Sequence, residues 1–281
     1  MAKPLENLKQ FIGKSETATD IVTASVMLKF AATLGLEKAP LHVGDVVPPG
    51  WHGGFFPPSH RPAQMREDGY PSGGLIPAIP LARHVSAVRT TFLEPLRVGD
   101  EIKQIIEIAD IRIDDGPTGA MATLIEKTSI SSSRGLAIVE ERDLVFSNQA
   151  RFGAAPKNAP LVPAEAKWKR VFEPKAALLF RWSAIRFNSD RIHYDRDYVT
   201  RAQLPGLVVQ DSLIRHLFIE MCGSEVPNRQ VHYFDFQPLL HTYDTGNFSI
   251  AGTPSADGRK ATLWSMDPNG QVTMTANAKF A

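Results

Sequence analysis

Two segments of the chain place hydrophobic residues at the spacing of one helix face. In the first, the apolar positions are 26, 27, 30, 31 and 34, with Thr23 as the residue that caps the start and Gly35 as the stop. The second repeats this spacing at positions 213, 214, 217, 218 and 221, with Asp211 as the cap and Gly223 as the stop. The pattern therefore predicts one helix in each half of the chain.

Runs rich in Val, Ile, Thr and Phe follow each predicted helix and indicate β-strands. The clusters at 114–117 and 267–270 are built from Asp, Gly, Pro and Asn, a composition typical of tight turns. Such turns favour antiparallel hairpins over parallel strands joined by helices. The predicted strands are 85–91, 101–113, 121–131, 136–146, 230–236, 246–251, 260–266 and 271–280. A helix followed by a mostly antiparallel sheet, in each half, predicts the α+β class.

The two halves also share short sequence matches in the same order. A Pro-Leu pair followed by Asp occurs at 95–100 and again at 238–244, with the prolines 143 residues apart. The tripeptide Ala-Thr-Leu starts at position 122 and again at 261, a shift of 139 residues. A stretch rich in Pro and Ala, 152–166, has the composition of a linker. We therefore predict a duplication, with an N-terminal domain at 1–150, a linker at 151–168 and a C-terminal domain at 169–281.

Charge and cysteine content exclude several classes of function. Lys plus Arg total 31 against 30 for Asp plus Glu, which leaves no net field to hold a nucleic acid or an anionic membrane. The single Cys222 excludes a disulfide framework and a cysteine-based metal site, and it fits a reducing compartment. The first 13 residues contain no apolar core followed by a cleavage site. We expect a cytoplasmic protein without nucleic-acid or membrane partners, and we leave self-association open.

Several familiar kinds of catalytic and cofactor site have no sequence support. The chain contains no Gly-x-Gly-x-x-Gly, no Walker-type phosphate loop and no Gly-x-Ser-x-Gly elbow. Its 8 histidines include no closely spaced pair with neighbouring carboxylates in the order of metal ligands. We therefore expect no bound metal.

One segment, 180–195, brings Asn188, Asp190 and His193 together with several arginines beside apolar positions. A second segment, 204–211, follows it with the sequence Leu-Pro-Gly-Leu-Val-Val-Gln-Asp. A histidine titrates near neutral pH, so an amide and a carboxylate beside it suit acid/base catalysis. The alternative interpretation is a solvated polar loop whose histidine only bonds to the backbone.

These two segments resemble the MaoC-type hydratase/dehydratase motif of the hotdog fold, whose usual form is Asp-x-Asn-Pro-x-His. The run 187–195 is more closely similar to a subgroup described as fungal-dehydratase-like, or mesaconyl- and itaconyl-CoA hydratase-like. Motifs at 11–16, 51–56, 95–100 and 140–143 resemble the same subgroup. The resemblance implies a double hotdog fold, in which two fused hotdog domains each wrap an antiparallel sheet around a central helix. It also implies that the C-terminal domain keeps the catalytic loop and that the N-terminal domain contributes to the substrate pocket.

The activity that the resemblance implies is the reversible addition of water to the α,β double bond of an acyl thioester. The protein is then a hydro-lyase acting on an enoyl- or 3-hydroxyacyl-CoA, with a short branched or dicarboxylic acyl group as one possibility. This reaction needs a base, an acid and hydrogen-bond donors for the thioester oxygen. We expect no cofactor other than the coenzyme A that belongs to the substrate.

The resemblance assigns a role to each polar residue of the motif. His193 exchanges the proton, Asn188 stands where the family has Asp and orients the water or the thioester, and Asp190 supplies a carboxylate. Backbone N–H groups at Gln210 and Asp211, at the start of a helix, serve the thioester oxygen. The family usually has a His-Gly-Pro-like run at this place, so Gln210-Asp211 is a departure from its pattern.

Two further groups of residues are candidates for binding the substrate. Trp51, Phe55 and Phe56 wall an acyl pocket or, alternatively, act as hydrophobic plugs between the halves. Arginines bind phosphates and carboxylates bidentately, so those near the motif are candidates for the coenzyme A phosphates or a substrate carboxylate; each is otherwise a surface residue. These arginines are Arg181, Arg186, Arg191 and Arg196.

Two other functions remain open at the level of sequence. The Gln210-Asp211 departure favours a degenerate double hotdog protein that binds an acyl thioester without catalysis. A hotdog thioesterase would need a carboxylate aimed at the thioester carbonyl, and Asp190 or Asp211 would supply it. The sequence leaves the acyl group open, as well as the choice between coenzyme A and an acyl carrier protein.

Overall fold

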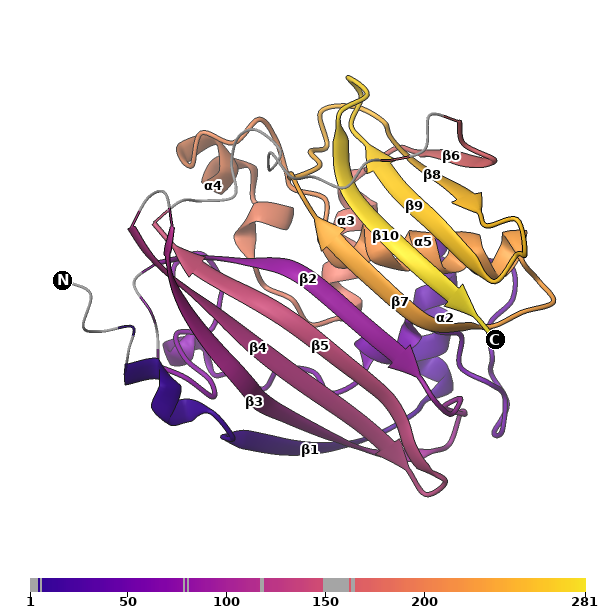
Figure 1. The fold of residues 1–281 in the computed structure, drawn as a ribbon, viewed down its shortest axis with the longest axis horizontal. Coiled ribbons are helices and arrows are strands. Elements are labelled where there is room, and N and C mark those ends of the chain that lie inside the picture. The colour runs from indigo at the N-terminus through magenta and orange to yellow at the C-terminus, as the bar shows by residue number, and fades with distance from the viewer. Residues whose placement is uncertain are drawn as a thin grey trace.

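The computed structural model describes residues 5, 7–77, 79, 81–116, 119–148, 162 and 165–281. Within these residues, ten strands form one antiparallel sheet in the order β1-β3-β4-β5-β2-β7-β10-β9-β8-β6 (Figure 1). The N-terminal half contributes β1 (Ser15–Ile21), β2 (Ala82–Phe92), β3 (Glu101–Gly116), β4 (Gly119–Ser132) and β5 (Gly135–Ser147). The C-terminal half contributes β6 (Trp168–Phe172), β7 (Val231–Pro238), β8 (Phe248–Pro254), β9 (Lys260–Met266) and β10 (Val272–Phe280). The second half repeats the strand order of the first in reverse, as expected for a duplication.

The two halves meet where β2 pairs with β7 in the middle of the sheet. The register runs from Val88 opposite Phe236 to Thr91 opposite Tyr233. The side chains of Val88, Phe234 and Phe236 are buried at this seam. Backbone hydrogen bonds and apolar packing therefore join the halves into one sheet.

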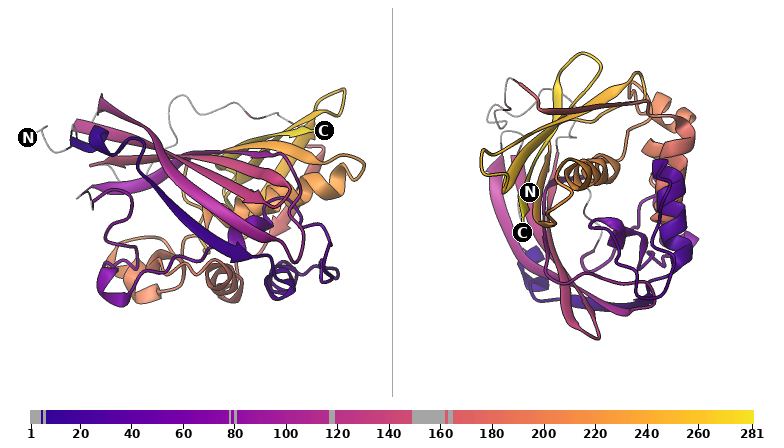
Figure 2. Two further views of the ribbon diagram at one scale, coloured as in Figure 1. Left: turned by 90° about the horizontal axis from the view of Figure 1, so that it is seen from below. Right: turned by 90° about the vertical axis from the view of Figure 1, so that its right-hand side faces the viewer.

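The helices lie on the concave side of this curved sheet (Figure 2). The longest described helix, α5 (Asp211–Glu225), runs inside the curve and packs on β7, β8, β9 and β10, with most of its residues buried. Helices α2 (Ala24–Leu34) and α3 (Ala176–Ile185) lie side by side across the open side of the curve. A shorter helix, α4 (Arg196–Arg201), precedes α5.

The two halves differ in what lies between the first helix and the next strand. The C-terminal half has the 3₁₀ turn η4 (Arg191–His193), then α4 and the central helix α5. At the corresponding place, the described part of the N-terminal half has two 3₁₀ turns, η2 (Trp51–Gly54) and η3 (Pro62–Gln64). A further 3₁₀ turn, η1 (Asn7–Phe11), precedes β1. The only long helix described in the N-terminal half is therefore α2, which corresponds in chain order to α3 and not to α5.

The eight predicted strands correspond to β2–β5 and β7–β10, and the first predicted helix is α2. Thr23 is its N-cap residue, and Gly35 ends it with a φ of 69°, the left-handed conformation that glycine adopts without strain. The predicted ends of the second helix are wrong by small amounts. Gln210 is the N-cap residue and Asp211 is the first helical residue, and the helix continues past Gly223 to Glu225. It ends just before Pro227, since the residue preceding a proline is driven out of the helical region.

The hydrophobic pattern did not reveal β1, β6, α3 and α4. Both strands are edge strands, and β1 is exposed along nearly its whole length, so it has no alternation of apolar and polar positions. Most of the predicted linker at 151–168 lies outside the described residues. No helix in the described ranges is long and apolar enough to cross a bilayer, the longest having 15 residues.

Because β2 and β7 share one ladder, we expect the two halves to unfold in a single cooperative transition. Far-UV circular dichroism and tryptophan fluorescence should give coincident urea curves. Truncation of the buried seam residue in Phe234→Ala should destabilise both halves together by about 3–5 kcal/mol. The control Leu28→Ala, at a side chain that is 56% exposed, should change stability by less than about 0.5 kcal/mol. Two separate transitions would show that the halves fold independently.

Candidate active site

The end of α3 sets the direction of the segment that carries the predicted catalytic residues. The N–H of Asn188 donates to the carbonyl of Ser183 (2.8 Å), and the N–H of Phe187 donates to that of Ala184 (3.3 Å). This pair of bonds is a Schellman motif, which requires a left-handed residue after the helix. Phe187 occupies that position with a φ of 49°. The chain therefore turns sharply between Arg186 and Asn188.

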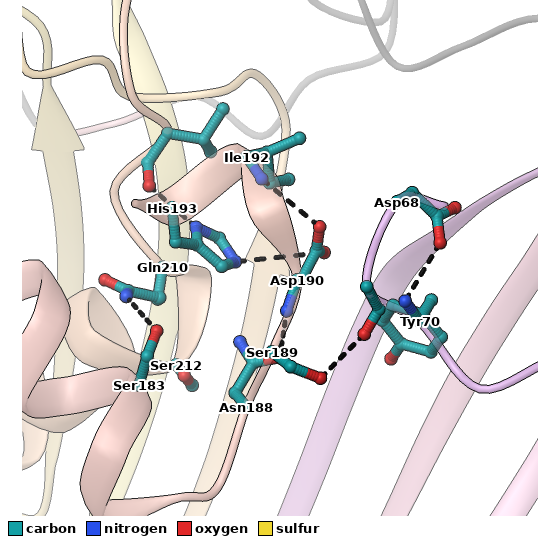
Figure 3. A network of polar contacts seen from close by, with 12 residues as sticks. Asp68, Tyr70, Ser183, Asn188, Ser189, Asp190, Ile192, His193, Gln210 and Ser212 are labelled. Carbon is teal, nitrogen blue, oxygen red and sulfur yellow. Dashed lines mark hydrogen bonds and ion pairs between the residues drawn. The ribbon is translucent and has the colours of Figure 1, made fainter. Parts of the chain in front are cut away.

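Asn188 and Asp190 are linked through the backbone of the loop that follows. The N–H of Asp190 donates to Oδ1 of Asn188 (3.2 Å), so the amide oxygen is occupied and the amide NH₂ group is left as a donor. The Asp190 side chain caps η4 by accepting from the N–H of Ile192 (3.4 Å). The two side chains thus belong to one rigid turn (Figure 3).

His193 is buried, and its hydrogen bond fixes the position of its proton. Its Nδ1 lies 2.7 Å from the carbonyl oxygen of Val208, which can only accept, so Nδ1 carries the hydrogen in the neutral ring. The lone pair of Nε2 then faces Oδ2 of Asp190 at 4.0 Å, as Figure 3 shows. This separation is too long for a direct hydrogen bond. A water or substrate oxygen placed beside these two atoms would be able to hydrogen-bond to both Nε2 of His193 and Oδ2 of Asp190.

Burial changes the proton affinity of the carboxylate in this pair. Removal from water raises the pKa of Asp190, and the opposing attraction of His193 does not cancel that effect. The carboxyl of Asp190 therefore keeps its proton to a higher pH than an exposed aspartate would. Such a pair is a candidate acid/base site.

A loop of the N-terminal half holds this turn in place. Oγ of Ser189 donates to the carbonyl of Gly69 (2.8 Å), and the N–H of Arg191 donates to that of Asp68 (2.9 Å). Gly69 has a φ of 83°, and a β-carbon there would overlap the carbonyl oxygen of Ser189. The sequence marks Asp68-Gly69 as a turn, but it gives no sign that the turn contacts a residue 120 positions away.

The start of α5 is connected to the same turn. The N–H of Val208 donates to the carbonyl of Ile192 (2.9 Å), so the strand-like segment before α5 runs beside η4. Nε2 of Gln210 donates to the carbonyl of Leu179 (2.8 Å) and to Oγ of Ser183 (2.9 Å), which fixes the helix start to α3. Gln210 is buried, and Asp211 opens the first turn of the helix. The predicted use of their backbone N–H groups for a thioester oxygen stays a prediction.

The three predicted aromatic residues lie in or against the hydrophobic core. Trp51 is 2% exposed and its ring centroid lies 5.1 Å from that of Phe30, while Phe55 is also buried. Phe56 is partly buried, with its N–H donating to Oδ2 of Asp20 (2.7 Å). These contacts lie within the N-terminal half, so both predicted roles, a wall of the acyl pocket and a plug between the halves, stay predictions.

Three of the candidate arginines have protein partners. Arg181 is exposed and reaches the carbonyl of Ala32 on α2 (3.4 Å). Arg191 pairs with Asp195 (2.7 Å), and Arg196 pairs with Asp244 (2.6 Å). Their guanidinium groups connect parts of the fold. Arg186 is different, because it lies at the seam between the halves.

A buried group of charges occupies this seam. Oε2 of Glu140, on β5, accepts from Nη1 of Arg215 on α5 (2.8 Å) and from Oγ1 of Thr90 on β2 (3.0 Å). Nε2 of His52 lies 3.7 Å from the same oxygen. Burial alone would raise the pKa of Glu140, but Arg215 and His52 outweigh it and hold the pKa well below its usual range. Burial lowers the pKa of His52, which keeps its ring neutral. Arg215 was not a candidate from sequence.

Among the hollows on the described surface, two are lined by residues close in sequence to the turn and to α3, and neither is lined by His193. One of about 450 Å³ lies beside the turn and is lined by Arg191, Asp195, Asp197, Thr200 and Arg201. The other, of about 260 Å³, is bordered by α3 and by the loop before β8. The described residues contain no cluster of three or more His, Cys, Asp or Glu side chains arranged to hold a metal ion.

Comparison with known proteins gives consistent results. Residues 50–244 match the family model of hydroxyacyl-thioester dehydratase type 2. The chain is 31% identical to mesaconyl-C(4)-CoA hydratase of Chloroflexus aurantiacus over 273 residues, which cover 96% of each chain. A MaoC-like dehydratase structure from Phytophthora capsici superposes with a TM-score of 0.69 at 12% identity, covering 98% of both chains. A Mycobacterium tuberculosis protein with a double hotdog fold superposes with a TM-score of 0.57 at 11% identity, covering 96% of both chains. The predicted double hotdog fold is thereby confirmed.

The contact between Gly69 and Ser189 can be tested with a matched pair of glycine variants. Gly270 has almost the same φ (81°), but a β-carbon there would meet no atom within 4 Å. Gly270→Ala should therefore cost only backbone strain, roughly 1–3 kcal/mol. Gly69→Ala should cost more, and it should also speed amide hydrogen exchange at 189–193. Equal effects of the two variants would mean that the contact does not hold the turn.

The raised pKa of Asp190 predicts a stability that depends on pH in a known direction. Below the unfolded-state pKa of about 3.9 the carboxyl is protonated in both states, and its burial then costs little. As pH rises through the folded-state pKa, the buried group must ionise, so this contribution to stability is lost. Asp190→Asn should accordingly gain stability over the native protein as pH rises above about 4. The control Asp114→Asn, at an exposed strand position, should show no such trend in urea denaturation.

Proposed function

Because this chain belongs to the hydroxyacyl-thioester dehydratase type 2 family, we propose that it catalyses the reversible hydration of an enoyl-CoA, with His193, Asp190 and Asn188 as the catalytic residues. Its similarity to mesaconyl-C(4)-CoA hydratase over nearly the full length supports coenzyme A as the carrier. A mesaconyl group is short, methyl-branched and bears a second carboxylate. We therefore extend the proposal to a short branched or dicarboxylic acyl group.

The observation that carries this proposal is the fixed tautomer of His193. Val208 holds the Nδ1 hydrogen, so Nε2 is free to act as a base toward the gap beside Asp190. In the hydration direction, Nε2 takes a proton from water while the water oxygen bonds to the β-carbon. The electrons of the double bond move into the thioester, which becomes enolate-like. The imidazolium then protonates the α-carbon, so His193 ends the cycle neutral.

Asp190 and Asn188 have separate proposed tasks. An ionised Asp190 at 4.0 Å stabilises the imidazolium that forms on His193. The amide oxygen of Asn188 is occupied by the N–H of Asp190, which leaves its NH₂ group to donate to the water or to the thioester oxygen. We propose that the backbone N–H groups at Gln210 and Asp211 donate to the same thioester oxygen, where the helix dipole favours negative charge.

We also propose the cellular setting and the composition of the active species. The buried thiol of Cys222, whose pKa is raised by burial to about 12, is unreactive and fits a reducing cytoplasm. The proposed reaction uses only acid/base groups, so it needs no cofactor beyond the coenzyme A of the substrate.

The test is incubation with a panel of enoyl-CoAs, following enoyl-thioester absorbance and free thiol together. Loss of absorbance without thiol release is expected. His193→Ala should lower the rate by roughly 10²–10⁴-fold with little change in thioester binding. Asp190→Asn should show a comparable loss if the carboxylate stabilises the imidazolium. His60→Ala, at an exposed histidine, serves as the control.

Four results would overturn parts of the proposal. Thiol release would mean thioester hydrolysis, and the absence of both signals would favour a binding protein. Full activity of His193→Ala would mean that the site has been misplaced. Near-normal turnover of Asp190→Asn would leave His193 as the sole proton carrier, with Asn188 orienting the water.

A further inference from the structure

We propose that Arg186 binds a carboxylate at the far end of the acyl group and so makes the site selective for dicarboxylic acyl thioesters. This inference rests on the proposed function and concerns its substrate specificity. It is carried by a partly buried guanidinium group that lies against the N-terminal half and has no acidic partner within the described residues.

Arg186 lies at the start of the catalytic turn, which is the segment 186–193 that carries Asn188, Asp190 and His193. Its side chain reaches toward the N-terminal half. Arg186 is the C-cap residue of α3, two residues before Asn188. Its guanidinium lies directly against the backbone of η2 in the other half, because a β-carbon on Gly53 would overlap Nη1 of Arg186. On the other side, the guanidinium carbon lies 5.9 Å from the centre of the Trp182 ring. A side chain at position 53 would therefore displace the guanidinium of Arg186 from this place.

The other charged groups in this part of the seam are already matched with one another. Glu140 accepts from Arg215, and Arg142 pairs with Glu126. Within the described residues, the guanidinium of Arg186 has the ring contact with Trp182 but no ion pair or hydrogen bond. The seam therefore holds three arginines against two glutamates.

The neighbouring histidines do not alter this balance, because both remain neutral. Burial lowers the pKa of His216 to about 3, with repulsion from Arg215 and Arg186 adding to the effect. Burial likewise lowers the pKa of His52. Within the part of the chain that the structure describes, Arg186 is attracted by Glu140 but has no carboxylate of its own, because Glu140 is paired with Arg215.

A partly buried cation without a carboxylate of its own is unfavourable, and the proton affinity of Arg186 reflects this. Burial and repulsion from Arg215 lower its pKa to about 10. A carboxylate is the ligand that matches the planar fork of a guanidinium, with two parallel hydrogen bonds.

The place of Arg186 beside the catalytic turn indicates which part of the substrate would supply the carboxylate. Asn188, which we propose to contact the water or the thioester, is two residues away. Arg186 therefore lies within reach of the acyl chain, at the seam between the halves. A substrate with a carboxylate at the far end of its acyl chain would reach both residues, with its thioester near Asn188 and its carboxylate at Arg186.

The experiment compares two substrates that differ only at the far end of a four-carbon chain. Crotonyl-CoA ends in a methyl group, and fumaryl-CoA carries a carboxylate at that position. The native protein should prefer fumaryl-CoA, and Arg186→Gln should lower its kcat/KM for fumaryl-CoA by about 10–100-fold. Turnover of crotonyl-CoA should change by less than about threefold. Arg186→Lys should fall between the native protein and Arg186→Gln, because it keeps the charge but not the fork.

Controls separate this inference from a structural role. Arg112→Gln removes an exposed arginine of β3 that pairs with Asp110, and it should leave both substrates unaffected. Thermal unfolding of each variant shows whether it is folded. Two results would overturn the proposal. One is an equal fall in kcat/KM for both substrates in Arg186→Gln and Arg186→Lys, and the other is a native protein that does not prefer fumaryl-CoA.

A binding measurement keeps the inference testable if no hydration is observed. Calorimetric titration with succinyl-CoA and butyryl-CoA asks the same question without turnover. Tighter binding of succinyl-CoA that is lost in Arg186→Gln would support the carboxylate site even if the proposed hydratase activity fails. Equal binding of the two saturated thioesters would overturn it.

Discussion

The pairing of β2 with β7 is the interaction on which the rest of the structure depends. It places two five-stranded units in one sheet, so that the curvature of the sheet is shared and α5 is enclosed by it. It also brings β5 of one half to face α5 of the other, where Glu140 and Arg215 meet. Without this ladder, the distance between Glu140 on β5 and Arg215 on α5 would not be fixed.

Burial of charge at the seam makes that arrangement specific. Glu140 and Arg215 come from different halves. Removing Glu140 would leave Arg215 buried without its carboxylate, and removing Arg215 would leave Glu140 with only Thr90 and His52 as partners. A slip of one residue between β2 and β7 would move Phe234 and Phe236 out of the core, so the ladder and the ion pair require the same register. Packing and electrostatics thus select one alignment of the halves.

Much of the fold was predictable because most strands are half-buried and follow a local pattern. The strand at 260–266 was predicted at the residues where β9 occurs, since β-branched and apolar residues lie between clear turns. The edge strand β1 was missed because its exposed side chains carry no such pattern. The motif at 188–193 was predictable as a run of neighbouring residues. The contacts of Gly69 with Ser189 and of Gly53 with Arg186 were not, because they join segments more than 100 residues apart.

The fusion of the two halves has a consequence for how such a site is able to change. In a two-fold symmetric dimer of identical subunits, every substitution appears on both sides of the axis, and an arginine near that axis would face its own copy. Here the C-cap of α3 is Arg186, while the corresponding C-cap of α2 is Gly35, and Arg186 lies against Gly53, a residue encoded separately. Each half is therefore free to vary alone. One is able to specialise in proton transfer while the other adjusts the shape and charge of the space around the acyl chain.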